Sequence, residues 1–398
     1  MGIIELEQQY CANNYHPLPV VLVKGQGAYV WDEQGNRYLD MMSAYSAVSH
    51  GHCHPRLVDA LRKQAGELTI VSRAFHTDKL APFLERLCDM TGQEMALLMN
   101  TGAEAVETAI KAARKWAYTV KGVEKDKAEI IACDGNFHGR TIAIVGMSSE
   151  EQYKEGFGPF PAGLKTIPYG DVEALQQAIT PNTAAFLVEP IQGEAGINVP
   201  PEGYLKACEA LCREHNVLMI CDEIQTGLGR TGKLLALQHE GIKPDGLIMG
   251  KALGGGMLPV SAFLASREVM GVFKPGDHGS TFGGNPLSCA VATEALDVLV
   301  EENLVARSAE LGEYFIRMLR EIDYPFIKDV RGKGLFVGVE IDPSKASARQ
   351  VCERLMARGI LSKETHDTVV RLAPPLVIER EPLENVSESL KSVLNDMA

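Results

Sequence analysis

The sequence predicts an α/β protein, with a mostly parallel sheet in a large domain and a small α+β domain beside it. Two short apolar runs, Val217–Cys221 and Leu247–Met249, have the length of strands, and each is closely followed by a charged residue and glycines. Continuous apolar runs of this kind are typical of strands buried on both faces of a parallel sheet. The 398 residues, 45% of them hydrophobic, are enough for one large and one smaller domain.

The overall composition indicates an acidic protein with reduced thiols. The formal net charge of −13 argues against nucleic acid or an anionic membrane surface as a partner. The nine cysteines form no CxxC pair and no regular framework, so we expect reduced thiols in a cytoplasmic protein. The first residues, MGIIELEQQY, do not resemble a signal or transit peptide, and no apolar run reaches membrane-spanning length.

The amino-terminal segment alternates apolar and polar residues over Ala28–Asp40 around a Gln34-Gly35-Asn36 turn, which predicts a β-hairpin. We place this hairpin in the small domain, whose first part would be residues 1–44. Tyr15 and Tyr45 are predicted to be core residues in preference to walls of a pocket.

Four potential metal ligands, His50, His52, Cys53 and His54, lie in the segment SHGHCHP. Their spacing is too tight for a closed tetrahedral site, Pro55 follows them, and no second pair of ligands is evident. We therefore predict a packed loop and no metal.

A helix amino terminus that could bind phosphate is predicted at Thr101, Gly102 and Ala103. The run LLMNTGAEAVETAIKAARKWAY passes from a short apolar segment through small residues to an amphipathic helix. Free N–H groups and the helix dipole favour an anion at such a place. Taken alone, Thr101 as a simple N-cap is the more ordinary interpretation.

The apolar run Ile130–Cys133 predicts another strand, and Phe137 and Arg140 follow it on the loop GNFHGRT. Beyond a strand end, an aromatic ring can stack on a planar cofactor and an arginine can bind a carboxylate. A core phenylalanine and a surface arginine are the alternatives.

A third strand, Ala185–Val188, is followed by the acids Glu189 and Glu194 in EPIQGEAG. Neither acid can bind a phosphate, but one of them could neutralise an arginine. Arg371 lies in the apolar run VVRLAPPLVI, so we expect it to be partly buried and to need a carboxylate partner. We predict that Glu194 is this partner.

Asp222 and Lys251 follow the two runs described first, and open α/β sheets bind ligands at the carboxyl ends of their strands. A lysine that forms a Schiff base with pyridoxal phosphate (PLP) and an aspartate that faces its pyridinium nitrogen fit this pair. In GKALGGG, Lys251 is flanked by residues with little or no side chain, which would let a planar ring approach. Either residue alone could equally be a strand end that meets solvent.

The glycines Gly227, Gly229 and Gly232 match the dinucleotide-binding pattern GxGxxG after a strand. The strand before them ends in Asp222-Glu223, whose charge would repel a pyrophosphate. A nicotinamide dehydrogenase is therefore a remote alternative.

Beyond Lys251 we predict a strand in VSAFLAS and then a glycine-rich loop. On this loop, Ser280 and Thr281 offer hydroxyl and amide groups to an anion of this subunit or of a neighbour. A long helix is predicted to begin at Pro286, and the large PLP-binding domain would span residues 45–300.

The remaining chain is predicted to complete the small domain over residues 301–398. Its order is helix, strand (Gly334–Ile341), helix (Ser347–Arg358) and a final apolar run, which is typical of an α+β domain.

With these motifs in place, the chain resembles the class III PLP-dependent aminotransferases over almost its whole length. The segments that carry the resemblance are NYHPLPV, SAYSAVSHGHCHP, NTGAEAVETAIKAARKW, GNFHGRT, VEPIQGEAG, CDEIQTGLGRTGK, GKALGGG, HGSTFGGNP, VRGKGL and RLAPPLVI. The resemblance implies fold type I (aspartate-aminotransferase-like), PLP as cofactor and a homodimer with active sites at the subunit interface. It also implies transfer of the δ-amino group of L-ornithine to 2-oxoglutarate, giving glutamate 5-semialdehyde and glutamate, in arginine degradation and proline biosynthesis.

The resemblance also assigns roles around the cofactor ring. Lys251 would form the Schiff base and shuttle a proton, and Asp222 would keep the pyridine nitrogen protonated. Phe137 would stack on the ring, and Gln225 would hydrogen-bond its phenolic oxygen.

The cofactor phosphate would be held by Gly102 and Ala103, together with Thr281 of the partner subunit.

The remaining roles concern the substrates. Tyr15 and Arg140 would bind the ornithine carboxylate, and Tyr45 would form a wall of the pocket. Arg371 would take the α-carboxylate of 2-oxoglutarate or glutamate, and Glu194 would cover Arg371 while ornithine is bound.

His138 departs from the pattern, since enzymes of this kind that act on ornithine have a tryptophan there and relatives acting on other ω-amines have histidine. The alternatives are therefore an acetylornithine, 4-aminobutyrate or other ω-amine aminotransferase and, more remotely, a non-catalytic binding protein on the same scaffold.

Overall fold

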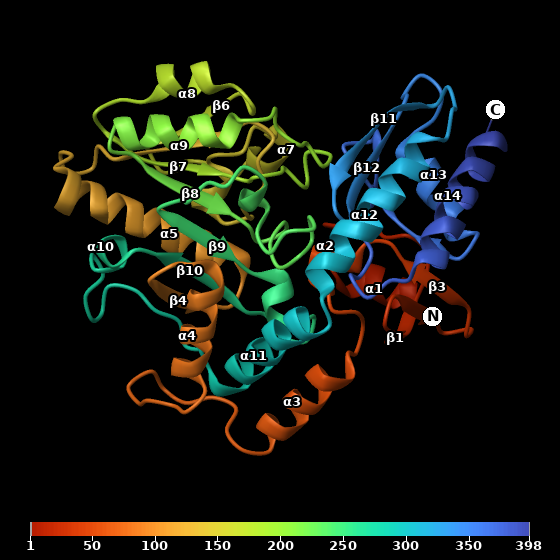
Figure 1. Cartoon of the computed structure of the whole chain (residues 1–398), viewed down its shortest axis with the longest axis horizontal. Coiled ribbons are helices and arrows are strands. Elements are labelled where there is room, and N and C mark those ends of the chain that lie inside the picture. Colours follow the sequence, from red (N-terminus) through yellow and green to blue (C-terminus); the bar gives the residue numbers. More distant parts are fainter. Residues whose placement is uncertain (1, 398) are drawn as a thin grey trace.

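The computed structural model describes residues 2–397, and Figure 1 shows two lobes built on three sheets. The larger lobe holds a seven-stranded sheet in which β10 alone runs antiparallel to its neighbours. In spatial order its strands are β4 (Met95–Met99), β10 (Ser261–Ala265), β9 (Gly246–Met249), β8 (Leu218–Asp222), β7 (Thr183–Val188), β5 (Glu129–Cys133) and β6 (Leu164–Ile167). The predicted mostly parallel sheet is confirmed.

The four strands β7 to β10 are buried along their whole length, which explains their continuous apolar sequences. The helices between residues 50 and 301 are α3 (Pro55–Ala65), α4 (Leu80–Thr91), α5 (Gly102–Trp116), α6 (Ile142–Val145), α7 (Glu151–Lys154), α8 (Val172–Ala178), α9 (Tyr204–Glu214), α10 (Arg267–Met270) and α11 (Pro286–Glu301). A π-helical turn (Ala117–Lys121) extends α5, and two 3₁₀ turns cover Ala236–His239 and Lys251–Gly254.

Alternate side chains of β8 serve the two faces of this sheet. Leu218 and Ile220 belong to the apolar cluster that contains the buried face of α5. Met219 and Cys221 belong to the cluster that contains residues of α9. Figure 1 shows α8 and α9 on one side of the sheet and α5 on the other. The helices thus cover the faces and leave the carboxyl ends of the strands available for a site.

The second lobe brings the two ends of the chain together (Figure 1). The hairpin strand β3 pairs in parallel with β13, with Leu39 opposite Ile360. The strands of this first small sheet are β1 (Leu22–Gln26), β2 (Tyr29–Asp32), β3 (Arg37–Asp40) and β13 (Ile360–Leu361). This pairing supports a small domain made of residues 1–44 and 301–398, and its boundaries stay a prediction.

The other small sheet is antiparallel throughout. Its strands, in spatial order, are β11 (Ile327–Lys333), β12 (Phe336–Ile341), β15 (Val369–Leu372) and β14 (Lys363–Thr365). The remaining helices are α1 (Ile3–Tyr10), α12 (Leu304–Arg320), α13 (Ala348–Met356) and α14 (Arg380–Asn395). The predicted order of helix, strand, helix and a final apolar run is observed as α12, β12, α13 and a run that begins with β15, while β11, β13, β14 and α14 were not predicted.

The predicted hairpin is present as β2 and β3. Asp32 closes its turn, since Oδ1 accepts hydrogen bonds from the N–H groups of Gln34 and Asn36 at 3.0 and 2.8 Å. The element labelled α2 (Ser43–Ser46) follows the hairpin and is a left-handed turn, with φ between 43° and 74°.

The histidine-rich loop after this turn is packed, as predicted. Nε2 of the buried His50 lies 2.9 Å from the carbonyl oxygen of Ala295, and Nε2 of His52 lies 2.7 Å from the Asp40 carboxylate. Within residues 2–397, no three His, Cys, Asp or Glu side chains are grouped so that they could hold a metal ion. Over the same residues, every helix is too short or too polar to span a bilayer.

The GxGxxG segment is a packing element. A β-carbon at Gly232 would lie 2.8 Å from Cα of Ala309 in α12, and one at Gly229 would lie 3.2 Å from the Leu376 side chain. Turns follow this segment in place of the helix that a dinucleotide fold requires. The basis for a nicotinamide site is therefore absent from the segment.

Candidate active site

A cavity of about 180 Å³ lies at the carboxyl ends of β7, β8 and β9. The pairing register explains its position, because Val188 lies opposite Cys221 and Asp222 lies opposite Ile248, so that the strands end at one level. The cavity is lined by Gly102, Ala103, Phe137, His138, Gly139, Glu189, Asp222, Ile224, Gln225, Thr226 and Lys251. The predicted meeting of an acid and a lysine at this edge is therefore observed.

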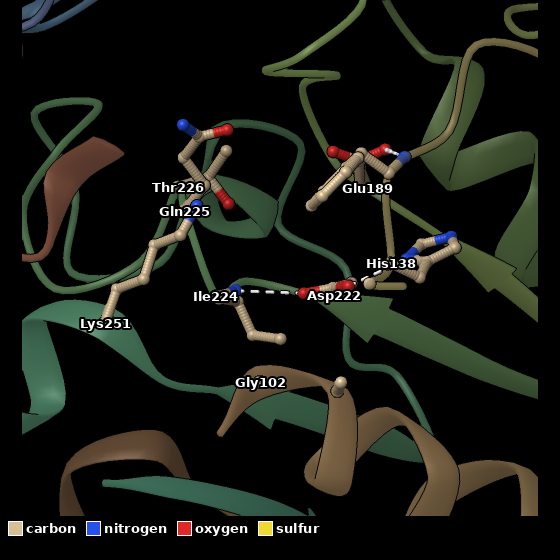
Figure 2. Close-up of a pocket in the computed structure, with 11 residues that line it drawn as sticks. Gly102, His138, Glu189, Asp222, Ile224, Gln225, Thr226 and Lys251 are labelled. Carbon is tan, nitrogen blue, oxygen red and sulfur yellow. Dashed lines mark hydrogen bonds and ion pairs between the residues drawn. The ribbon is translucent and has the colours of Figure 1, made fainter. Parts of the chain in front are cut away.

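Asp222 ends β8 and is held from two sides, as Figure 2 shows. Its Oδ2 lies 2.7 Å from Nδ1 of the buried His138, and its Oδ1 accepts a hydrogen bond from the N–H of Ile224 at 3.0 Å. Burial lowers the pKa of His138, but the hydrogen bond and charge of Asp222 outweigh it and raise the pKa above its usual value. These two hydrogen bonds fix the Asp222 carboxylate at one wall of the cavity.

Lys251 begins the 3₁₀ turn after β9 and has a left-handed backbone, with φ of 47°. Burial lowers the pKa of its amine, against the opposing effect of Glu194. A lowered pKa increases the neutral fraction of the amine, which is the form that attacks a carbonyl carbon.

The start of α5 forms another part of the cavity wall, through Gly102 and Ala103. Thr101 is the N-cap, and its side chain accepts a hydrogen bond from the N–H of Glu104 at 3.2 Å. Thr101 is therefore an N-cap, and Gly102 and Ala103 also line the cavity, so the two interpretations of this segment are compatible. A β-carbon at Gly102 would lie 2.9 Å from Cδ1 of Ile224, so glycine allows this close approach. The first N–H groups of a helix have no partner inside the helix and are available to an anion.

Arg371 and Glu194 form the predicted ion pair beside the cavity. Nη1 and Nη2 of Arg371 donate to the two carboxylate oxygens of Glu194 at 2.7 and 3.0 Å. Arg371 is 1% exposed. Burial by itself raises the pKa of Glu194, but Arg371 outweighs it and lowers the pKa to about 2. Gln225 joins the pair to the cavity, with Nε2 3.5 Å from Oε1 of Glu194.

Tyr15 and Tyr45 are not core residues, and the prediction of burial for them was wrong. Tyr15 is 76% exposed and Tyr45 is 36% exposed. The Tyr45 ring centroid lies 6.0 Å from Nζ of Lys251 and 5.2 Å from Cζ of Arg371. The left-handed turn therefore places this ring between the amine of Lys251, which lines the cavity, and the guanidinium of Arg371.

The loop after β5 places its two predicted residues differently. Phe137 lines the cavity. The exposed Arg140 instead lies over the Tyr153 ring, with Cζ 3.6 Å from its centroid, and 5.2 Å from the Phe137 centroid. Thr281 is exposed and lies outside the cavity of its own chain. The roles of Arg140 and Thr281 stay predictions.

Sequence reasoning did not find the contribution of His138 to Asp222, nor the place of Ile224 and Thr226 in the wall. It placed Glu189 at this edge as a possible partner of an arginine. Glu189 Oε2 instead accepts a hydrogen bond from the N–H of Phe137 at 3.0 Å, and burial raises the pKa of Glu189 to about 7. The sequence signal for a buried acid at this position was that Glu189 directly follows the apolar run Ala185–Val188.

These residues fit the groups of PLP. An amine with a lowered pKa suits its aldehyde, a fixed carboxylate suits its pyridine nitrogen, and a helix start suits its phosphate. The fold and the cavity together define a PLP-dependent enzyme of fold type I.

The comparisons with known proteins agree with this site. The model of the class III aminotransferase family matches residues 10–394, and the chain belongs to this family. An ornithine aminotransferase of Geobacillus sp. (strain WCH70) is 63% identical over 391 residues, which cover 98% of each chain. The ornithine aminotransferase structure of Toxoplasma gondii, described with partial occupancy of PLP at its active site, has a TM-score of 0.97 and 48% identity, covering 99% of this chain and 93% of that one. The acetylornithine aminotransferase structure of Elizabethkingia anophelis has a TM-score of 0.89 and 47% identity, covering 99% and 98%.

Proposed function

We propose that this protein is an ornithine aminotransferase, which transfers the δ-amino group of L-ornithine to 2-oxoglutarate. The single observation that carries the proposal is the ion pair beside the cavity, in which the buried Arg371 donates two hydrogen bonds to the carboxylate of Glu194. The names of the 63% identical relative and of the 48% identical structure support the same substrate.

When bound, PLP supplies an aldehyde that exchanges amino groups and a ring that takes up the electrons left behind when a proton is removed from the substrate carbon. The protein would hold this group with four elements of the cavity. Lys251 would bind its aldehyde carbon and afterwards move a proton at the reacting substrate carbon. Asp222, fixed by His138, would keep a proton on the pyridine nitrogen, Phe137 would lie against the ring, and Gly102 would face the phosphate.

The two substrates need different environments at Arg371. In ornithine, no carboxylate lies next to the carbon that carries the δ-amine, so Arg371 would be left as an unpaired buried charge. Removing one partner of a buried ion pair costs about 3–5 kcal/mol. Glu194 would cover Arg371 during this half-reaction and release it to the α-carboxylate of 2-oxoglutarate in the other.

Tyr45 lies close to both the reacting amine and the arginine that would bind a carboxylate. Its ring lies near both the amine of Lys251 and the guanidinium of Arg371. We propose that it forms the wall that separates the reacting end of the substrate from solvent. Tyr15 and Arg140 would then hold the far carboxylate of ornithine, which extends away from Lys251.

We further propose a cytoplasmic homodimer in which Thr281 of the partner subunit completes each phosphate site. This is supported by the exposure of Thr281 and by the neighbouring Phe282, which is 57% exposed and would be covered in an interface. Burying an apolar side chain of this size against another subunit lowers the free energy of the assembly, because apolar surface is removed from water.

An amine panel tests the substrate. Initial rates with 2-oxoglutarate would be compared for L-ornithine, N-acetylornithine and 4-aminobutyrate, and the aldehyde product of ornithine would be detected after it cyclises. We expect kcat/KM for ornithine to exceed that of the other two amines by about tenfold or more, a difference of about 1.4 kcal/mol. A higher value for N-acetylornithine would assign the chain to the activity named for the Elizabethkingia protein.

A further inference from the structure

A buried arginine outside the cavity has no described role. Arg230 is fully buried, and its four side-chain hydrogen bonds all go to uncharged oxygens. Nη1 donates to the carbonyls of Leu335 and Pro374 at 2.9 and 2.6 Å. Nη2 donates to the hydroxyls of Ser43 and Ser49 at 3.0 and 2.9 Å. Burial of a cation costs free energy of desolvation, and the four hydrogen bonds offset this cost only in part. We therefore asked what the guanidinium does in the structure.

Three of the four oxygens, those of Pro374, Ser43 and Ser49, belong to segments that carry residues of the proposed substrate site, and the fourth, that of Leu335, directly precedes β12. Pro374 follows β15, which holds Arg371. Ser43 is the first residue of the turn that holds Tyr45, and Ser49 lies three residues after its last. The guanidinium therefore joins the two sides of the substrate pocket to the loop after β8.

The turn that Arg230 contacts is strained. Four successive residues that are not glycine, Ser43, Ala44, Tyr45 and Ser46, have φ of 43°, 46°, 59° and 74°. L-residues occupy this left-handed region singly, and a run of them requires support from the surrounding structure.

The support comes through the two serine hydroxyls. Ser43 Oγ donates its proton to the carbonyl of Ala373 at 2.7 Å, and Ser49 Oγ donates to the carbonyl of Ser46 at 2.9 Å. Each hydroxyl has a single proton, so in both cases the oxygen is left to accept, and Arg230 is the donor that it receives. The guanidinium therefore fixes both ends of the turn in one orientation.

We propose that Arg230 is a positioning residue that holds residues 43–46 in the left-handed turn and thereby places Tyr45 opposite Lys251 and Arg371. Relaxation of the turn to the right-handed region would point the Tyr45 side chain elsewhere. The choice of ornithine as the test substrate rests on the proposed function. The positioning role itself rests on the left-handed backbone of residues 43–46 and on the hydrogen bonds of Arg230.

Four variants separate positioning from general packing. Ser49→Ala removes one acceptor of the guanidinium and one hydrogen bond of the turn, and Arg230→Met removes all four donors at similar size. Ser308→Ala is the matched control, because this buried serine donates to the backbone carbonyl of Arg230 at 3.0 Å and accepts from the N–H of Leu335 at 3.2 Å, but forms no hydrogen bond with the guanidinium or with residues 43–46. Ser46→Gly, added to Ser49→Ala, lowers the energy of the left-handed conformation without Arg230.

The first measurement is amide hydrogen exchange of residues 41–50 in the PLP-loaded proteins. We expect exchange to be about tenfold faster or more in Ser49→Ala and Arg230→Met and unchanged in Ser308→Ala. The second is steady-state kinetics, where KM for ornithine should rise about fivefold or more while PLP content and kcat stay within about twofold. In Ser49→Ala with Ser46→Gly, KM should return to within about twofold of the unmodified enzyme.

Unchanged exchange and unchanged KM in a folded Ser49→Ala would overturn the proposal, and so would an equal effect of Ser308→Ala. If Arg230→Met does not fold, Ser49→Ala and its glycine rescue decide the matter. If the unmodified enzyme does not turn over ornithine, the proposed function fails, while the exchange measurement still decides the role of Arg230.

Discussion

Replacing Glu194 by alanine should shift the enzyme from δ-amines toward α-amino acids. The pair of Glu194 and Arg371 is well shielded, with side chains 24% and 1% exposed. Two unit charges about 4 Å apart attract by about 4 kcal/mol at an effective dielectric constant of about 20. An α-carboxylate must displace this pair in the unmodified enzyme, whereas in Glu194→Ala it meets a free guanidinium.

Only part of this energy should appear in the rates, because water and buffer anions can reach Arg371 once Glu194 is gone. A hydrogen bond to a charged group contributes about 1.5–3 kcal/mol, so the selectivity should change by about 10- to 150-fold. We therefore expect the ratio of kcat/KM for glutamate to that for ornithine to rise by at least about tenfold.

Single half-reactions measure this ratio directly, through the change in cofactor absorbance after rapid mixing with ornithine or glutamate alone. Glu194→Gln is the control, because it keeps the size of the side chain and removes the charge, and it should give an intermediate ratio. A ratio in Glu194→Ala within about twofold of the unmodified enzyme would refute the proposed exchange of partners at Arg371.

The other predictions concern the cofactor wall. Lys251→Ala should abolish turnover, and near-normal steady-state rates in this variant would contradict its role. Asp222→Ala should lower kcat by about 100-fold or more and weaken PLP retention, as measured by rate assays and by absorbance after dialysis, because the ring then loses the anion that keeps its nitrogen protonated. Glu189 carries a pKa raised by burial from 4.5 to about 7, so its contribution to stability is fully present below pH 4.5 and is lost as the pH rises through 7. Glu189→Gln should remove this loss, up to about 3 kcal/mol, and flatten the dependence of the urea midpoint on pH between about 5 and 8; an unchanged slope would contradict the assignment.

The parts of the site that could be predicted are those that local sequence determines. A fully buried strand needs a continuous apolar run, so the position of Asp222 at the end of β8 and of Lys251 just beyond β9 followed from the run lengths. The partnership of Glu194 with Arg371 followed from the cost of burying an arginine without a carboxylate.

The parts that could not be predicted depend on contacts between distant segments. His138 meets Asp222 across 84 residues, and Arg230 meets Ser43 across 187. Nothing in the segment SAYS indicates a left-handed turn, since none of these residues prefers that conformation in isolation. Without this turn, an aromatic residue such as Tyr45 is reasonably expected in the core, which is why that prediction failed.

The contrast between local sequence and distant contacts also distinguishes the two parts of the site, the cofactor wall and the substrate wall. The cofactor wall is built at the ends of adjacent strands, and its geometry follows from the sheet itself. The proposed substrate wall consists of Tyr45, Glu194 and Arg371, on three segments that meet only through tertiary contacts such as those of Arg230. The substrate wall can therefore change without loss of the cofactor wall, which agrees with structures named for ornithine and for acetylornithine at 48% and 47% identity to this chain. On the proposed roles, the choice of amine would depend on how the turn at residues 43–46 and the Glu194–Arg371 pair are held, and measurements on those two features test it more sharply than any change at Lys251.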